Sequence, residues 1–168
     1  MMNLYVAAPF ERAPEVRDLH ALARPLGITA VSFWAEEAHG PENLRSLPRD
    51  VVRALGRKND RDLLSAHLVV ALASYGAGGE MFAEVRLALA HRIPVLWIGT
   101  RSILSAYREG VLRADTLADG MILLGGFADI LSTVTIFEKR KARETLWEAI
   151  EALQGKDGGR PRDPAQVA

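Results

Sequence analysis

The sequence contains no cysteine, which excludes a disulfide framework, a thiolate metal site and a cysteine nucleophile. It also lacks a net charge: 21 lysines and arginines balance 21 aspartates and glutamates, so nothing indicates non-specific binding to nucleic acid or to an anionic membrane. The first ten residues carry no basic segment ahead of an apolar one, and no apolar run approaches membrane-spanning length. We therefore expect a cytoplasmic protein with neither nucleic acid nor a membrane as its partner.

Motifs for metals and cofactors are missing as well. The histidines His20, His39, His67 and His91 show no metal-ligand spacing. The glycine cluster that ends at Gly79 lacks the Lys-Ser/Thr pair of a Walker loop and the third glycine of a dinucleotide fingerprint. We therefore expect no metal ion and no cofactor.

The chain does contain enough apolar residues, 49% of 168, for one domain with a real core, and it is too short for two domains of ordinary size. We expect a single α/β domain over residues 1–154. The remaining residues, 155–168, are rich in glycine, proline and charge, a composition that predicts a disordered tail.

Residues 67–98 show the clearest structural pattern of the sequence. Residues 67–73 are apolar and β-branched, as in a strand that is buried on both faces, and a helical period begins at Glu80. Pro94 then opens a second apolar run, residues 95–98. Between the first strand and the helix lie three glycines that favour a tight turn close to a ligand: Gly76, Gly78 and Gly79. This is the pattern of a βαβ crossover, whose first turn is where open α/β sheets bind ligands.

Similar patterns elsewhere predict a flavodoxin-like or Rossmann-type α/β fold, with about five mainly parallel strands and helices on both faces. Further strands are expected at residues 4–8, 28–34 and 120–124. Helices are expected at residues 13–26, 50–55, 60–66 and 102–109, and residues 127–154 form either one long helix or two.

Glu84 is the unusual residue of the central unit. It lies about one turn beyond the glycines and four positions after Glu80, so the two carboxylates share a helix face. A carboxylate that points at a glycine-lined crevice can serve as a nucleophile or general base. Alternatively, both glutamates are solvated and favoured by the helix dipole.

Three separated stretches resemble one known family. They are N-L-Y-V-A-A-P-F at residues 3–10, N-D-R-D-L-L-S-A-H-L-V-V-A-L at residues 59–72, and G-G-E-M-F-A-E-V-R-L-A-L-A-H-R-I-P-V at residues 78–95. Their order and spacing resemble the nucleoside 2-deoxyribosyltransferase superfamily, which includes related nucleotide N-hydrolases. The resemblance covers residues 3–99 and selects Glu84 over Glu80 as the family's catalytic glutamate.

The resemblance implies roles for particular residues. Glu84 would attack the anomeric carbon of a nucleoside or nucleotide, and Tyr5 would hydrogen-bond that carboxylate; otherwise Tyr5 is a half-buried sheet aromatic. Either Asp60 or Asp62 would hold the sugar hydroxyls or assist departure of the base, and the alternative is a helix cap or a solvated helix end. The resemblance also implies these substrate-binding residues: Ala8, Pro9, Phe10, Gly76, Gly78, Gly79, Glu80 and Arg86.

The implied activity is transfer of deoxyribose from one base to another through a covalent glycosyl-glutamate. The alternatives are a nucleoside or nucleoside 5′-monophosphate N-hydrolase and, outside enzymes, a nucleotide-sensing module. The chain departs from the family at Arg86, where the family has glycine, and at His67, where it often has aspartate. Gly78 stands where the nucleotide hydrolases have a phosphate-binding serine, which argues against a monophosphate substrate.

A homodimer or higher homo-oligomer is also expected. The resemblance implies that a neighbouring chain closes the pocket. Independently, the apolar residues of the segment 127–150 exceed what a small sheet needs to cover. They are Phe127, Ile130, Val134, Phe137, Leu146, Trp147 and Ile150. The alternative is a monomer in which this segment folds back on its own sheet.

Overall fold

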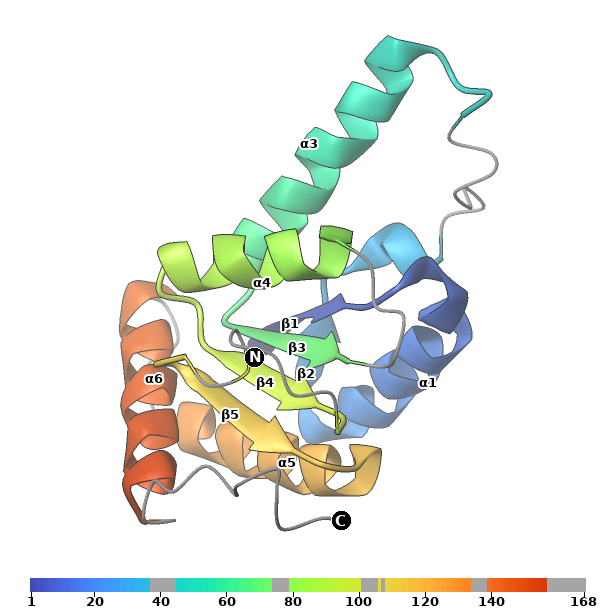
Figure 1. Ribbon diagram of the computed structural model, residues 1–168. Coiled ribbons are helices and arrows are strands. Elements are labelled where there is room, and N and C mark those ends of the chain that lie inside the picture. The colour runs from blue at the N-terminus through green and yellow to red at the C-terminus, as the bar shows by residue number, and fades with distance from the viewer. Residues whose placement is uncertain (37–44, 74–78, 101–105, 107, 134–138, 157–168) are drawn as a thin grey trace, which may run out of the picture.

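The computed structural model describes residues 1–36, 45–73, 79–100, 106, 108–133 and 139–156. Over these residues the chain forms one five-stranded parallel sheet in the order β2-β1-β3-β4-β5, with helices on both faces (Figure 1). This confirms the expected fold class. The strands are β1 (Met2–Ala7), β2 (Ile28–Ala30), β3 (Leu68–Leu72), β4 (Val95–Ile98) and β5 (Val111–Ala114).

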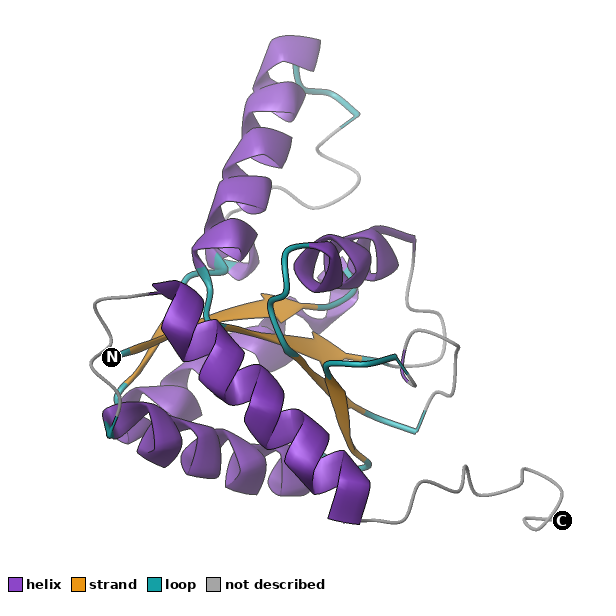
Figure 2. Ribbon diagram, turned by 90° about the vertical axis from the view of Figure 1, so that its left-hand side faces the viewer, coloured by secondary structure: helices purple, strands orange, loops and turns teal. Residues whose placement is uncertain are grey.

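The helices form two layers around the sheet. They are α1 (Ala13–Ala23), α3 (Arg49–Ser65), α4 (Gly79–Ala90), α5 (Leu117–Ser132) and α6 (Lys139–Lys156), with short 3-10 segments at Phe10–Arg12, Arg24–Leu26 and Phe33–Ala35. One core cluster joins α1, α5 and α6 to one face of the sheet, and the other joins α4 and the end of α3 to the opposite face. Figure 2 shows α5 and α6 on the side of the sheet away from α4.

Strand β1 supplies side chains to both layers. Because successive residues of a strand point to opposite faces, Leu4 and Val6 pack toward α1, whereas Tyr5 and Ala7 pack toward α3 and α4. All four are fully buried, as expected for an apolar strand at the centre of a parallel sheet. This alternation is what turns Tyr5 toward α4.

The strand order also creates a switch point at the carboxyl ends of β1 and β3. Strand β1 lies between β2 and β3, so the chain leaves β1 toward one edge of the sheet and then continues from β3 toward the other edge. The neighbouring connections therefore diverge at the carboxyl ends of β1 and β3, and such a switch point forms a crevice in open α/β sheets. In register, Tyr5 of β1 lies beside Val69 of β3.

The prediction of a strand at residues 120–124 is wrong: these residues lie inside α5, and the fifth strand is β5. Thr116 caps α5, because its Oγ1 accepts a 3.1 Å hydrogen bond from the backbone N–H of Asp119. A short apolar run does not by itself distinguish a strand from a buried helix segment. The glycine pair at 125–126 continues the same helix.

Other boundaries differ from the expected ones. The two short helices predicted between residues 50 and 66 are one helix, α3, because Gly56 does not interrupt it. The second strand ends at Ala30 instead of Trp34, and a 3-10 turn follows. The segment 127–154 contains parts of two helices, α5 and α6. The helix predicted at residues 102–109 lies mostly outside the described residues, as does the predicted tail, although α6 continues to Lys156.

Helix α3 projects from the body of the molecule. In both Figure 1 and Figure 2 its first half extends beyond the sheet and the other helices. Leu63, close to its end, is the only residue of α3 that is buried, and Val51 and Val52 near its start are 37% and 36% exposed. The last turns of α3 therefore attach the helix to the core, and its first turns do not.

The apolar residues expected to drive association are used within the chain. Phe127, Leu146, Trp147 and Ile150 are buried within the chain, so these four residues pack on their own domain. These four side chains therefore do not provide exposed apolar surface for a dimer. Val134 and Phe137 lie outside the described residues. None of the helices in the described part of the chain is long and apolar enough to span a bilayer.

Candidate active site

The centre of the candidate site is a hydrogen bond between Tyr5 and Glu84. The Tyr5 hydroxyl donates to Glu84 Oε1 at 2.6 Å, across 79 residues of sequence. Tyr5 is fully buried on β1, and Glu84 is partly buried in the second turn of α4. This confirms the predicted contact, which arises because β1 lies beside β3, the strand that leads into α4.

The surroundings of Glu84 disfavour its charged form. The pKa of its carboxyl is raised from 4.5 to about 7: burial is the largest cause, the Tyr5 hydrogen bond lowers the pKa, and the charges of Glu80 and Asp60 contribute to the rise. The pKa of the Tyr5 phenol is also raised, first by burial and then by Glu84, Asp62 and Asp60. Tyr5 therefore stays protonated and donates, while Glu84 changes its protonation near neutral pH.

Asp60 and Asp62 come to this site from the last turns of α3. Both charges act on Tyr5, and Asp60 also acts on Glu84. Asp62 is partly buried and forms an ion pair with Lys58, whose Nζ lies 3.4 Å from Asp62 Oδ2. The two atoms are not oriented for a hydrogen bond. Residues two apart on a helix point in nearly opposite directions, so the two aspartates have different surroundings. Asp60 is exposed to solvent.

The segment after β1 lies at the switch point of the sheet. Ala8, Pro9 and Phe10 are all half-buried there. The ring of Phe10 lies 6.1 Å from that of Trp34, and Trp34 Nε1 donates a 2.9 Å hydrogen bond to the carbonyl of Val6. Three aromatic side chains, Tyr5, Phe10 and Trp34, thus gather near the end of β1.

Trp34 and Lys58 were not predicted as site residues. The sequence placed Trp34 at the end of a strand, whereas the structure places it in a 3-10 turn that folds back beside β1. Lys58 Nζ also lies 5.5 Å from the centre of the Phe33 ring. A signal for Lys58 was present in the sequence, because it stands four residues before Asp62, the spacing of a helical ion pair.

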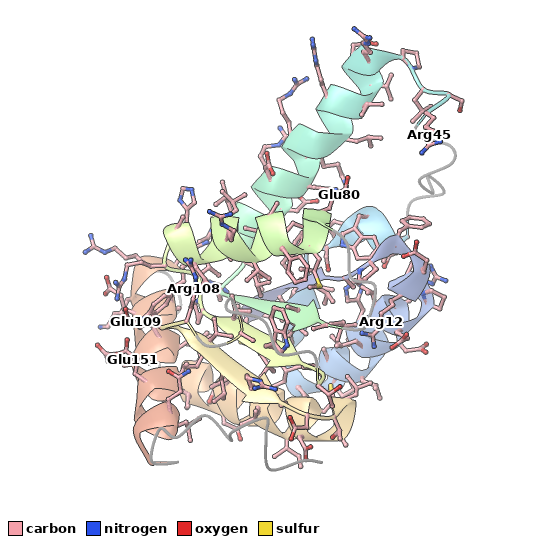
Figure 3. The ribbon with its side chains drawn as sticks, in the orientation of Figure 1. Arg12, Arg45, Glu80, Arg108, Glu109 and Glu151 are labelled. Carbon is pink, nitrogen blue, oxygen red and sulfur yellow. The ribbon has the colours of Figure 1, made fainter. Side chains whose placement is uncertain are left out.

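Helix α4 begins beside the same crevice. Gly79 and Glu80 form its first turn, and both are exposed. Figure 3 shows Glu80 at this end of the helix. Gly76 and Gly78, predicted to bind substrate, lie outside the described residues. The part of the crevice that can be described therefore comprises β1, the segment after it, the end of α3 and the start of α4.

The structure does not bring Arg86 to this crevice. Arg86 is two residues beyond Glu84, about 200° around the helix, and its side chain is exposed. It lines a hollow farther along α4 together with Leu89 and Trp147. Arg86 is therefore a predicted site residue whose side chain lies away from Glu84.

The site is acidic and aromatic. Among the described residues, no three histidines, aspartates or glutamates come together as possible metal ligands. Glu84, with its pKa near 7, can act as a nucleophile when it is ionised or exchange a proton when it is not. Tyr5 can hold one carboxylate oxygen and leave the other directed at a ligand.

No protein-family model, curated protein or solved structure matches the chain. The chemistry of Tyr5, Glu84 and the two aspartates is therefore the basis for a functional assignment.

Proposed function

We propose that this chain cleaves the N-glycosidic bond of nucleosides or deoxynucleosides through a covalent glycosyl-glutamate at Glu84, and transfers the sugar to another base. The 2.6 Å hydrogen bond from the buried Tyr5 hydroxyl to Glu84 is the observation that carries the proposal. It joins the two residues to which the family resemblance gives catalytic roles. It also leaves the second carboxylate oxygen of Glu84 available for attack.

In the proposed reaction the ionised Glu84 carboxylate attacks the anomeric carbon of the sugar. A C–O bond forms, the C–N bond breaks, and its electron pair leaves with the base, which takes up a proton from water or from the aspartate that assists its departure. The developing positive charge on the sugar is stabilised by the adjacent carboxylate. A nitrogen of a second base then attacks the same carbon, which releases Glu84 and completes the transfer.

The other residues would bind and orient the substrate. Asp60 or Asp62 would accept hydrogen bonds from sugar hydroxyls or assist the departing base. Phe10 and Trp34 offer aromatic surface for a planar base, since base–aromatic stacking contributes about 1–3 kcal/mol per base in single-stranded nucleic-acid sites. Their position beside Tyr5 supports a substrate that carries an aromatic ring.

The same carboxylate supports a second reaction. A glutamate with a pKa of about 7 can accept a proton from water at neutral pH, and water as the acceptor would make the protein an N-hydrolase. A nucleotide-sensing module would bind the same ligand without turnover. The three functions differ in their products, so one assay separates them.

The experiment incubates the protein with a panel of nucleosides and deoxynucleosides, with and without a free base. Base exchange identifies a transferase, release of free sugar identifies a hydrolase, and binding without either identifies a sensor. Glu84→Ala should abolish turnover, because loss of a covalent nucleophile removes about 6 kcal/mol or more of transition-state stabilisation. Glu80→Ala is the matched control on the same helix face. Loss of activity in Glu80→Ala but not in Glu84→Ala would assign the nucleophile to Glu80.

A further inference from the structure

A second hollow lies at the other end of α4, away from Tyr5 and Glu84. It has a volume of about 530 Å³, and Leu89 on α4 and Trp147 on α6 contribute apolar surface to it. Figure 3 shows Arg108 and Glu109 near this end of α4, opposite the end that carries Glu80. The charged residues around the hollow are Arg86, Arg92, Arg108 and Glu109.

This hollow is positively charged in a chain whose net charge is zero. Three guanidinium groups and one carboxylate line it, so its charge is 3 − 1 = +2. None of the three arginines forms an ion pair with a carboxylate in the part of the chain that the structure describes. Within the described residues, their positive charge is therefore not neutralised by a direct ion pair.

Arg92 occupies a backbone position that favours glycine. Its φ is +51°, in the left-handed region. The backbone N–H groups of Arg92 and Ile93 donate to the carbonyls of Leu89 and Ala88, at 3.0 and 2.9 Å, which is the pattern of a Schellman helix end. A side chain at this position costs about 1 kcal/mol relative to glycine. An arginine that stands there despite this cost points to a role for its side chain.

The Arg92 side chain is held over an aromatic ring. Its guanidinium carbon lies 4.7 Å from the centre of the Trp147 ring, and Trp147 Nε1 donates a 2.6 Å hydrogen bond to Glu151. Gly110 makes room for the ring, since a Cβ there would lie 2.3 Å from it. Trp147 is 6% exposed, so the ring supports the arginine and leaves little surface for a ligand to stack on. Arg92 is thus positioned in advance at the edge of the hollow.

We propose that this hollow binds a small ligand that carries two or more phosphate groups. Guanidinium groups match the geometry of phosphate oxygens and bind them by charge-assisted hydrogen bonds. Three of them around one hollow favour a ligand with several negative charges over a single carboxylate. A volume of about 530 Å³ lies within the range of small-molecule sites. The site is separate from Glu84 and does not depend on the proposed catalytic activity.

The test uses tripolyphosphate as the probe and the indole N–H signal of Trp147 as the readout. In a ¹⁵N-labelled sample at low salt, the Trp147 signal, assigned with Trp147→Phe, should shift on titration, whereas the signals of Trp34 and Trp97 should not. The variant with both Arg86→Gln and Arg108→Gln should bind at least about tenfold more weakly, because it loses two charge-assisted contacts. Arg24→Gln, an exposed arginine on the other face of the sheet, is the control and should bind as the wild type does.

The variant Arg92→Gly is an independent test. It removes a guanidinium group, and glycine readily adopts the left-handed backbone conformation at this position. It should fold and should also bind more weakly. The proposal is overturned if the Trp147 signal stays unchanged at millimolar tripolyphosphate, or if the arginine variants bind as tightly as the wild type. Equally tight binding of citrate would overturn the assignment to phosphate. A protein inactive on nucleosides that still binds tripolyphosphate would separate this proposal from the catalytic one.

Discussion

Glu84 shows how a single carboxyl group acquires reactivity from its surroundings. A solvent-exposed glutamate is ionised at neutral pH, but the pKa of Glu84 is raised to about 7, chiefly by burial, although the hydrogen bond from Tyr5 lowers it. Its ionised form is therefore less stable, and more basic, than that of a surface glutamate. Two predictions follow from this pKa, one for the rate and one for stability.

The rate should depend on the ionisation of Glu84. If Glu84 is the nucleophile, kcat/KM should rise with pH and level off above about 7. Tyr5→Phe removes the hydrogen bond that lowers the pKa, so the rise should move to higher pH. Glu80→Gln removes a charge that raises the pKa, so it should move to lower pH. Initial rates measured across pH for the three proteins test this, and a midpoint unmoved by both substitutions would contradict it.

The free energy of unfolding should fall over the pH range in which the rate rises, because both depend on the ionisation of Glu84. Because the pKa of Glu84 is raised from 4.5 to about 7 in the folded protein, the native state binds the proton more tightly, and stability falls as pH rises from 4.5 to 7. Glu84→Gln keeps the shape and removes the charge. It should be more stable than the wild type at pH 8 by up to about 3 kcal/mol, since each pKa unit corresponds to about 1.4 kcal/mol.

Urea unfolding at pH 4 and at pH 8 measures this difference. The gap between Glu84→Gln and the wild type should close at pH 4, where both carry a neutral side chain. Glu148→Gln, on an exposed position of α6, should show no such pH-dependent gain. A gain for Glu84→Gln of equal size at both pH values would mean that charge burial is not its cause.

At the scale of elements, α5 is pressed against the sheet through a glycine. A Cβ on Gly120 would lie 2.3 Å from Cδ1 and 2.9 Å from Cγ1 of Ile98 on β4, whereas one on Gly125 would meet nothing within 4 Å. Gly120→Ala should therefore be destabilised by about 1–3 kcal/mol, the range for overpacking in a core. Gly125→Ala should gain about 0.5–1 kcal/mol, because glycine is unfavourable inside a helix. Thermal unfolding of both variants checks the pair, and equal effects would show that α5 does not pack this closely.

The composition of residues 120–124 explains why the sequence predicts a strand inside α5. Residues 120–124 are apolar throughout, with no polar face to reveal a period of 3.6, and the two following glycines resemble a chain break. The strand Val95–Ile98 was predicted with its observed bounds, because Pro94 marks its start and Gly99 follows its end. Sequence patterns thus located elements with clear boundaries and failed at α5, where an apolar residue, Ile122, stands on the exposed face of the helix.

The candidate site also contains some contacts that the sequence predicts and others that it does not. The contact between Tyr5 and Glu84 was predictable, because it depends on two strands being neighbours and on the alternation of side chains along β1. The position of Trp34 depends on a turn that folds back to the end of β1, and the arginine hollow depends on how α6 packs near α4. Neither follows from a local pattern, since each joins residues from separate elements.

For the whole molecule, a second subunit that closes the site needs exposed apolar surface, which the buried residues Phe127, Leu146 and Ile150 do not provide. The exposed valines of α3, Val51 and Val52, provide apolar surface on the same helix that carries Asp60 and Asp62. If two copies associate through α3, sedimentation at micromolar concentration should show a dimer, and Val52→Glu should dissociate it. Ile122→Glu, at a 74% exposed position of α5, should leave it intact. A fully active monomer would contradict the shared site.

The projecting half of α3 has a consequence for hydrogen exchange. A short helix without tertiary contacts is marginally stable in water, because most helical stability comes from packing of an apolar face. In an isolated chain the amides near Arg49 should therefore exchange quickly, while those near Leu63, which reaches the core, should be protected. Exchange measured along α3 would show this gradient. Uniform protection would mean that another molecule covers its first half in solution.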